Sequence, residues 1–425
     1  MELILGKITI NNIDFGSQTK VEAETLYVNR DELISHIAVD ERLDSIEVQL
    51  ARPGESVRII PVKDVVEPRV KVDGANDVFP GFLSDVKQVG SGRTHVLKGA
   101  AVVTCGRIAG FQEGLIDMSG PAADYSPFSQ LNNIVLVLEP KEGIARHEHE
   151  EALRLAGLRA AAYLGQAGKD LTPDETTTYS LDPIASLTGD LPKVVYVKML
   201  LSEGLLHDTY LYGVDVKQIL PTLIHPNEGM DGAIVSGNCV SACDKHTTYH
   251  HQNDPVIEDL YRRNGKDLNF VGVITSNVNV RLADKERSAE YTAKLVDLLG
   301  VDGAVITEEG FGNPDTDLMM LCQKIEKLGV KTVLITDEYA GSDGLSQSLA
   351  DGTQAATAIV SVGNANMMLE LPSMERIIGH LEPVEVIAGG FADGLKPDGS
   401  VSVELQVVMG ATCQLGFSPL AARAR

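Results

Sequence analysis

The chain is poor in positive charge and in long apolar runs. It carries 36 Lys and Arg residues against 60 Asp and Glu residues, a formal net charge of −24 over 425 residues. Nucleic-acid-binding proteins need a positive face to neutralise phosphates, and anionic membranes also attract basic residues. The sequence contains no run of about 18 apolar residues, the length that crosses a bilayer. These absences argue against binding to nucleic acid and against a membrane protein.

Cysteine is scarce as well. The five cysteines, at positions 105, 239, 243, 322 and 413, are odd in number and unevenly spaced, which does not suit a disulfide framework. The N-terminus, MELILGKITINN, lacks the basic-then-apolar order of a secretory signal. We therefore expect a cytoplasmic protein in a reducing compartment, with Cys105, Cys322 and Cys413 as buried thiols.

Two phosphate-binding motifs are also missing. The chain has no G-x-G-x-x-G after a strand-like segment and no G-x-x-x-x-G-K-[ST]. These glycine-rich turns are what let a backbone approach the phosphates of dinucleotides and nucleotides. The sequence therefore gives no support to an NAD-dependent or nucleotide-dependent enzyme.

The apolar pattern predicts an α/β protein with three regions. Residues 1–75 alternate apolar and polar positions, as in KITINNIDF, and predict a β-rich N-terminal region. Residues 76–238 predict a middle α/β region with a helix in HEHEEALRLAGLRAAAYLGQAG and a long surface loop over 168–192. Residues 239–425 predict a C-terminal α/β domain.

Strands and helices alternate after residue 265. The strand-like segments LNFVGVITS, DGAVITEEG and VKTVLITDE are separated by an amphipathic helix that ends at Gly300 and by a helix from Pro314 to Gly329. This β-α-β-α-β order with short joins predicts a doubly wound parallel sheet. Such sheets bind ligands beyond the carboxyl ends of their strands.

Charged residues follow the predicted strands of that sheet. Glu308 and Glu309 come directly after the second strand, and Arg281 lies just beyond the first. Carboxylates at this edge would attract an amine and repel a phosphate. Glu308 and Glu309 are candidates to bind a substrate amine, and a solvated strand end is the alternative. Arg281 is a candidate to bind a substrate carboxylate by a bidentate contact, and ion pairing at the surface is the alternative.

The densest group of reactive side chains lies in SGNCVSACDKHTTYHH, residues 236–251. Cys239 and Cys243 are four residues apart, and His246 and His250 repeat that spacing. Sulfur and imidazole together suit zinc or iron. The spacing is not a recognised C-x-x-C pairing, however, and no second cysteine pair follows. We assign no metal ligand, although a Cys/His metal protein stays an alternative.

Two further chemical interpretations of this segment remain. A redox pair is one, but C-x-x-x-C is looser than the C-x-x-C of thioredoxin-like chemistry. The other uses the backbone: Gly237 and Asn238 tolerate a strained conformation at the exit of the strand-like DGAIV. The Cys239 thiolate can attack the Asn238 carbonyl and form a thioester. Elimination of the sulfur and hydrolysis then leave a chain that begins with a pyruvoyl group. The plainest alternative is a loop with buried thiols and hydrogen-bonded histidines.

A long stretch of the sequence resembles a known family. The segment from GNCVSACDKHTTYHHQNDPVIEDLYRRNGKDLNFVGVITSNVNVRLADKERSAEYTAKLVDLLG to VDGAVITEEGFGNPDTD resembles the proprotein of glycine/sarcosine/betaine reductase component B, which matures into subunits alpha and beta. VQLARPGESVRIIPVKDVVEPRVKVDG, near the N-terminus, is similar to the same family. The resemblance runs nearly end to end, and D-proline reductase's proprotein is a more distant relative.

The resemblance implies a site and a covalent cofactor. It implies a cut between Asn238 and Cys239, with Cys243 as the second candidate, and a pyruvoyl group made from Cys239. The pyruvoyl ketone would form a Schiff base with the amine of glycine or sarcosine. The quaternary nitrogen of betaine, the family's third substrate, cannot form one, so betaine would need another explanation. His246 and His250 would be the acids or bases, because histidine titrates near neutral pH.

The resemblance also implies partners. A selenocysteine on another subunit of component B would attack the substrate carbon, since the sequence here contains none. Selenoprotein A, the acetyl-phosphate-forming component C and thioredoxin would complete a reductive deaminase that acts on a C–N bond with a disulfide as acceptor. A non-catalytic scaffold subunit of the same complex is the alternative.

Overall fold

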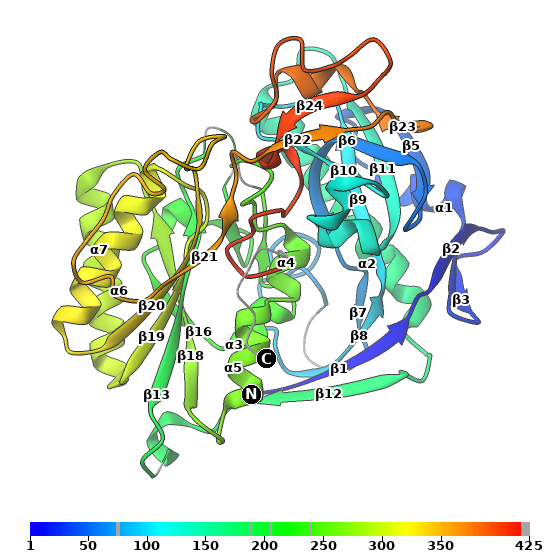
Figure 1. Cartoon of the computed structure of the whole chain (residues 1–425). Helices are drawn as coiled ribbons and strands as arrows, with labels where there is room; N and C mark the ends of the chain where they lie inside the picture. The colour runs from blue at the N-terminus through cyan, green and yellow to red at the C-terminus, as the bar shows by residue number, and fades with distance from the viewer. Residues whose placement is uncertain (74–76, 188, 205, 207, 238–239, 418–425) are drawn as a thin grey trace.

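The computed structural model of the chain describes residues 1–73, 77–187, 189–204, 206, 208–237 and 240–417. Three larger sheets and three small ones carry the fold (Figure 1). The class is mixed α/β, which confirms the prediction from the sequence. The helices are α1 (Arg30–Ile37), α2 (Arg146–Gly165), α3 (Pro226–Met230), α4 (Thr248–Gln252), α5 (Pro255–Arg263), α6 (Leu282–Leu299) and α7 (Asn313–Lys327).

Two of the larger sheets come mainly from the first third of the chain. One has the order β12 (Glu175–Ser180), β1 (Glu2–Thr9), β8 (Gly92–Lys98), β7 (Arg69–Lys71). The other has the order β10 (Gly114–Asp117), β6 (Val57–Val66), β9 (Ala100–Gly106), β11 (Asn132–Pro140), β5 (Leu43–Ala51), and β23 (Arg376–Gly379) also pairs with β6. Helix α2 packs on β6 and β9, so this region is α/β in its packing and β-rich in its content.

The third sheet is the predicted parallel one. Its order is β16 (Thr222–Ile224), β18 (Asn269–Val278), β13 (Lys193–Leu201), β19 (Gly303–Thr307), β20 (Lys331–Glu338), β21 (Ile359–Asn364). All neighbours pair in parallel except β16, which is antiparallel to β18. The small sheets pair β15 (Val214–Asp215), β14 (Tyr210–Leu211) and β17 (Ile234–Val235); β2 (Asn12–Phe15), β4 (Thr25–Val28) and β3 (Lys20–Glu22); and β22 (Met368–Leu371) with β24 (Val401–Glu404).

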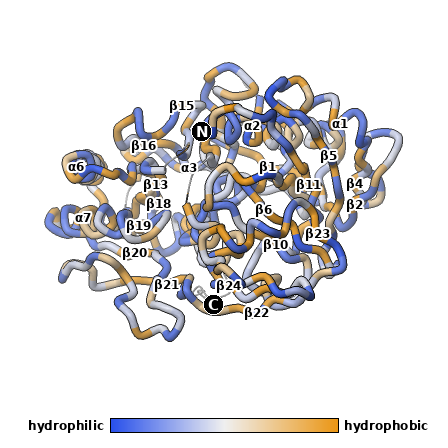
Figure 2. Tube along the Cα trace, turned by 90° about the horizontal axis from the view of Figure 1, so that it is seen from above, coloured by the Kyte–Doolittle hydropathy of each residue, from blue (hydrophilic) through white to orange (hydrophobic). Residues whose placement is uncertain are grey.

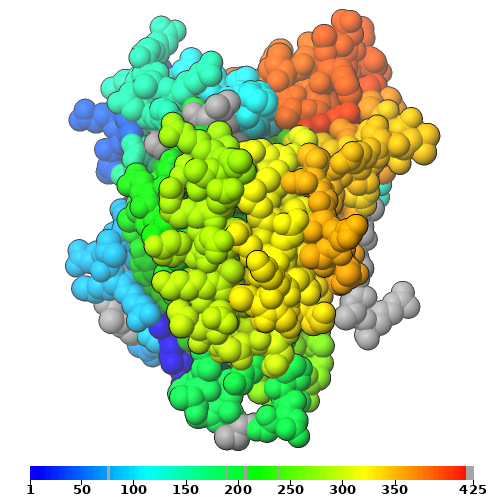
Figure 3. All heavy atoms as spheres, turned by 90° about the vertical axis from the view of Figure 1, so that its left-hand side faces the viewer, coloured from blue at the N-terminus to red at the C-terminus, as the bar shows by residue number. Residues whose placement is uncertain are grey.

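Helices cover both faces of the parallel sheet because its central strand is apolar on both faces. Alternate residues of β13, Val195, Val197, Met199 and Leu201, belong to the apolar cluster that includes residues of α6 and α7. Tyr196 and Leu200, on the opposite face, belong to the cluster that includes Ile257 and Leu260 of α5. Figure 3 shows the face of the molecule that α6 and α7 form, in yellow-green and yellow.

The helix boundaries follow the signals in the sequence. Gly300 ends α6 in a left-handed conformation with φ of 59°, and Gly329, two residues after α7, has φ of 85°. Glycine adopts positive φ without a steric penalty, which is why it marks both ends. The loop predicted over 168–192 is partly wrong, since β12 lies inside it and pairs with β1 through backbone hydrogen bonds that its Thr-rich sequence does not announce.

The sheets combine strands from distant parts of the chain. β13 lies before the predicted cut, yet it pairs on either side with β18 and β19, which come after it. β23, from the C-terminal region, pairs with β6. The predicted boundaries at residues 75 and 238 therefore do not coincide with the limits of the sheets. The division of the chain into domains at these residues stays a prediction.

Apolar residues follow the sheet strands and polar residues the outer turns (Figure 2). In the part of the chain that the structure describes, no helix combines the length and the apolar character needed to cross a bilayer. The four described cysteines, Cys105, Cys243, Cys322 and Cys413, are buried and free, as expected for a chain without a disulfide framework.

Candidate active site

The cysteine–histidine segment runs through the interior of the protein. Every described residue from 236 to 252 is buried, including the whole of α4. Polar side chains are costly to bury unless they find partners, so a buried polar segment of this length needs an explanation in chemistry or binding. Asn238 and Cys239, the predicted cleavage site, lie outside the described residues.

Helix α4 is anchored to the sheet below it. Its N-cap, Thr247, accepts a hydrogen bond from the His250 backbone N–H at 3.3 Å. Thr248 donates its backbone N–H and its hydroxyl to the buried carboxylate of Asp64 on β6, at 3.0 and 2.7 Å, and accepts from the Ser236 N–H at 3.1 Å. These contacts hold Ser236, which precedes the predicted cut, and Thr248, which follows it, against β6.

Three buried histidines lie together after the predicted cut. His246, His250 and His251 are each 0% exposed. Burial lowers the pKa of all three, so the rings are neutral at neutral pH. His250 Nδ1 accepts from the Thr247 N–H at 3.2 Å. Among the described residues, its Nε2 has no hydrogen-bond partner, nor does either ring nitrogen of His246 or His251.

This lack of partners indicates a binding site. A neutral imidazole has one N–H donor and one acceptor nitrogen, and a buried polar group without a partner costs about 1–3 kcal/mol. The rings of His246 and His251 are 5.9 Å apart between centroids, in an edge-on arrangement. A polar ligand or water between them would satisfy both rings. The prediction that His246 and His250 belong to the site fits this geometry.

Glu309 lies beside the histidines. Its carboxylate accepts the backbone N–H of Leu201 at 2.9 Å and that of His246 at 3.2 Å, and its Oε2 is 4.0 Å from His246 Nδ1. Burial raises the pKa of Glu309 to about 7, opposed by these N–H donors and by Lys245 and Lys198. A carboxyl with a pKa near 7 can both give and take a proton at neutral pH.

The other two predicted contacts differ in exposure. Glu308 is 0% exposed, accepts from the Thr336 hydroxyl, and has its pKa raised by burial and by Asp315. Arg281 is exposed and serves as the N-cap residue of α6. A carboxylate bound by Arg281 would therefore stay at the hydrated surface, whereas the two glutamates face the interior.

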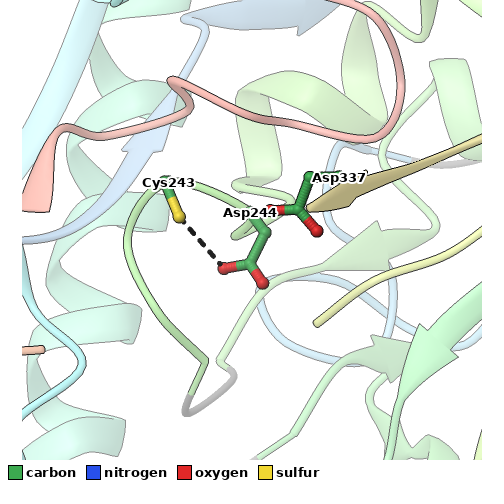
Figure 4. A group of neighbouring side chains, drawn as sticks. All are labelled: Cys243, Asp244 and Asp337. Atoms are coloured by element: carbon green, nitrogen blue, oxygen red, sulfur yellow. Dashed lines mark hydrogen bonds between the residues drawn. The ribbon is translucent and has the colours of Figure 1, made fainter. Parts of the chain in front are cut away.

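Several residues of the site escaped the sequence analysis. Lys198 on β13 is 1% exposed and forms an ion pair with Asp254 at 2.7 Å, and Lys245 is 2% exposed. The signal for Lys198 was a lysine in the middle of the otherwise apolar strand KVVYVKMLL. Asp337, at the end of β20, comes close to Cys243 and Asp244, a contact that only the fold reveals (Figure 4).

The whole chain matches one protein family. The family model of glycine/sarcosine/betaine reductase component B subunits matches residues 1–423. The chain is 59% identical over 428 residues to the glycine reductase complex component B subunits alpha and beta of Acetoanaerobium sticklandii, with 100% of each chain covered. It is 56% identical over 426 residues to the sarcosine reductase complex component B subunit alpha of Peptoclostridium acidaminophilum, again with 100% of each covered.

A more distant relative is a D-proline reductase proprotein of Acetoanaerobium sticklandii, 22% identical over 344 residues, which are 76% of this chain and 53% of that protein. No solved structure matches the chain significantly. The full-length matches confirm the resemblance seen in the GNCVSACDKH segment. The chain belongs to the glycine/sarcosine/betaine reductase component B subunits and is a component of a multi-subunit amino-acid reductase complex.

Proposed function

We propose that the chain is a proprotein that cuts itself between Asn238 and Cys239 and carries a pyruvoyl group at the new N-terminus. The observation that carries this proposal is the buried segment after the cut, with its unpartnered imidazoles. Two names among the relatives support it. The glycine reductase relative, matched over its full length, is named as two subunits, alpha and beta, and the distant relative is named a proprotein.

Gly237, the residue before Asn238, lies in tightly packed surroundings. A Cβ added to Gly237 would lie 2.9 Å from the Tyr210 ring and 3.0 Å from both the Asp208 carbonyl oxygen and Glu150 Oε1. Only glycine lets the chain pass so close to these groups. This close packing at Gly237 supports a cut in the following residues, because a reaction within the chain is favoured where the backbone is held.

A pyruvoyl group at position 239 would supply a ketone that condenses with a substrate amine and draws electrons from the C–N bond. The residues of the chain prepare that amine. Glu309, with its pKa of about 7, takes a proton from the substrate ammonium. The neutral ring of His246 accepts a hydrogen bond from the same nitrogen. His250, whose pKa burial lowers to about 3, would contribute as a neutral hydrogen-bonding ring and not as the acid or base expected from the sequence.

Substrate binding follows the same charges. Ionised Glu309 attracts the ammonium group, and the low dielectric around it strengthens the attraction. Glu308, whose pKa burial raises, is the proposed second contact of the nitrogen and would bind it by a hydrogen bond. Arg281 is the proposed contact of the substrate carboxylate, weakened by its exposure to water. Cys243 is the second candidate for the cut, because it too lies in the buried segment.

The complete reaction takes other proteins. A partner selenocysteine attacks the α-carbon as the amine leaves, and selenoprotein A and component C carry the product to acetyl phosphate. Reduced thioredoxin supplies the two electrons and becomes a disulfide, which is the acceptor when the reaction is written in the reverse direction. The enzyme is thus a reductive deaminase in its assembled form. We place it in the cytoplasm, where free cysteines such as Cys105 and Cys413 stay reduced. A non-catalytic scaffold is the second candidate, and the uncut chain would be its mark.

A denaturing gel of the purified protein tests the proposed cut directly. We expect two bands, and mass analysis should assign them to residues 1–238 and 239–425, the second with a blocked N-terminus that reacts with carbonyl reagents. A single band near 45.6 kDa in active protein would instead support the scaffold. Bands whose ends map to Cys243 would move the cut to the second candidate.

Trapping with borohydride tests the substrate. Labelled glycine or sarcosine should become attached to the 239–425 fragment, because each has an amine that can condense with a ketone. Labelled betaine should not, since its quaternary nitrogen has no proton to lose. Each label is tested without borohydride as the control. Active protein that retains no label from any of the three would contradict the proposed role of the ketone.

A further inference from the structure

A buried cluster of three potential ligands lies next to the histidines. Apart from Cys243 as the second candidate for the cut, it has no role in the chemistry above. It consists of Cys243 and Asp244, from the segment after β17, and Asp337, at the end of β20 (Figure 4). Their ligand atoms, one sulfur and two carboxylate oxygens, all lie within 4.8 Å of one another. Each of the three residues is 1% exposed or less.

The hydrogen bonds around Asp337 stabilise its ionised form. Its Oδ2 accepts the Thr412 hydroxyl at 2.8 Å, and its Oδ1 accepts the side-chain N–H of Gln414 at 3.1 Å. Both donors are 0% exposed. Two fixed donors orient the carboxylate, which is the usual support of a metal ligand by the residues behind it.

Asp244 and Gln414 each have an oxygen without a partner. Asp244 Oδ1 accepts from the Cys243 thiol at 3.6 Å, but among the described residues its Oδ2 has no hydrogen-bond partner, and neither has the side-chain oxygen of Gln414. Ionised, Asp244 Oδ2 has no donor; protonated, its proton has no acceptor. Gln414 reaches the cluster through its bond to Asp337, so both unpartnered oxygens border the same buried group.

No positive side chain neutralises the cluster. In the described part of the chain no Lys, Arg or His forms an ion pair with Asp244 or Asp337. Buried charges in proteins are paired or coordinate metals, and a cation would fill the missing role here.

We propose that Cys243, Asp244 and Asp337 bind one Zn²⁺ ion. Zinc accepts thiolate sulfur at about 2.3 Å and carboxylate oxygen at about 2.0–2.2 Å, and with three protein ligands it keeps a fourth position for an oxygen ligand such as water. The three ligand atoms lie within 4.8 Å of one another, so small side-chain rotations would bring each of them to its bonding distance from a common ion. On binding, the thiol gives its proton to solvent. This set shares only Cys243 with the Cys/His set that the sequence offers.

Metal content after loading with Zn²⁺ and removal of unbound ion is the test. Wild-type protein should hold about one zinc per chain, and Cys243→Ser and Asp337→Asn should lower that content at least tenfold. Two matched controls, Cys322→Ser for a buried thiol and Asp317→Asn for a buried carboxyl, should retain it. Only trace zinc in the wild-type protein, or full content in Cys243→Ser, would overturn the proposal.

Cobalt reports on the sulfur ligand in folded protein. Wild-type protein loaded with Co²⁺ should show the near-ultraviolet charge-transfer absorption of a thiolate ligand, and Cys243→Ser, with an unchanged thermal unfolding midpoint in the absence of metal, should lack it. Bound cobalt without that absorption in the wild-type protein would contradict the assignment. The uncut Cys239→Ala chain should still bind zinc, so the metal site and the proposed self-processing can fail independently.

Discussion

Replacing Cys239 with alanine is expected to leave the chain whole and to abolish reductase activity in the reconstituted complex. Alanine has no sulfur to attack the Asn238 carbonyl, so neither the thioester nor the ketone can form. The loss should be complete within the detection limit, because the carbonyl that a pyruvoyl group supplies has no substitute among the twenty side chains. A denaturing gel and an activity assay with glycine measure both effects.

Matched cysteine variants make this result specific. Cys322→Ala, at a buried thiol on α7, should be cut and active, and Cys243→Ala should be cut whatever its activity. The Cys239→Ala chain should keep the unfolding midpoint of an uncut wild-type precursor. Continued cutting of Cys239→Ala would place the reacting sulfur elsewhere and remove the basis of the proposed function.

Replacing Glu309 with glutamine should lower kcat by roughly 10²–10⁴-fold, the usual range for the loss of a general base. The proposed role needs an ionised Glu309. Since burial raises its pKa to about 7, activity of the wild-type protein should rise as the pH increases through about 7. Glutamine preserves the shape and cannot titrate, but its single amide oxygen can accept only one of the two N–H groups, of Leu201 and His246, that the carboxylate accepts. The rise should therefore be missing from the variant's pH profile.

Asp317→Asn is the control for this experiment. Burial raises the pKa of Asp317 to about 7 as well, but this residue pairs with Lys285 between α6 and α7, on the other side of the sheet. The inflection near pH 7 should remain in that variant. An inflection that persists in Glu309→Gln would assign the titration to another group and exclude Glu309 as the base.

Local signals in the sequence were enough for the helices of the parallel sheet and for the neighbourhood of the cut. Helices α6 and α7 were predictable because apolar spacing and a terminal glycine act within one turn of the helix. His246 and His250 were predictable as neighbours because α4 and its cap bring residues of one short segment together. Both are consequences of contacts over a few residues.

Contacts between distant segments could not be predicted in this way. Asp64 holds Thr248 across 184 residues, and Asp337 meets Thr412 across 75. Nothing in a single sequence marks such pairs. Strand β12 was missed because an edge strand with a mostly exposed, Thr-rich sequence lacks apolar alternation. Arg281 was placed at the correct end of β18, but exposure depends on how α6 turns away, which the sequence does not reveal.

The position of β13 between β18 and β19 decides how a matured molecule would behave after denaturation. After a cut between Asn238 and Cys239, the two fragments would stay associated through the backbone hydrogen bonds of β13 with β18 and β19. Their reassembly after unfolding would become a second-order event between two polypeptides, each with an incomplete sheet. The stability of the mature form would then be kinetic: it would be set by the slow rate at which the two fragments unfold and separate, and not by a reversible folding equilibrium. The uncut precursor is a single polypeptide, and its folding would need no association step.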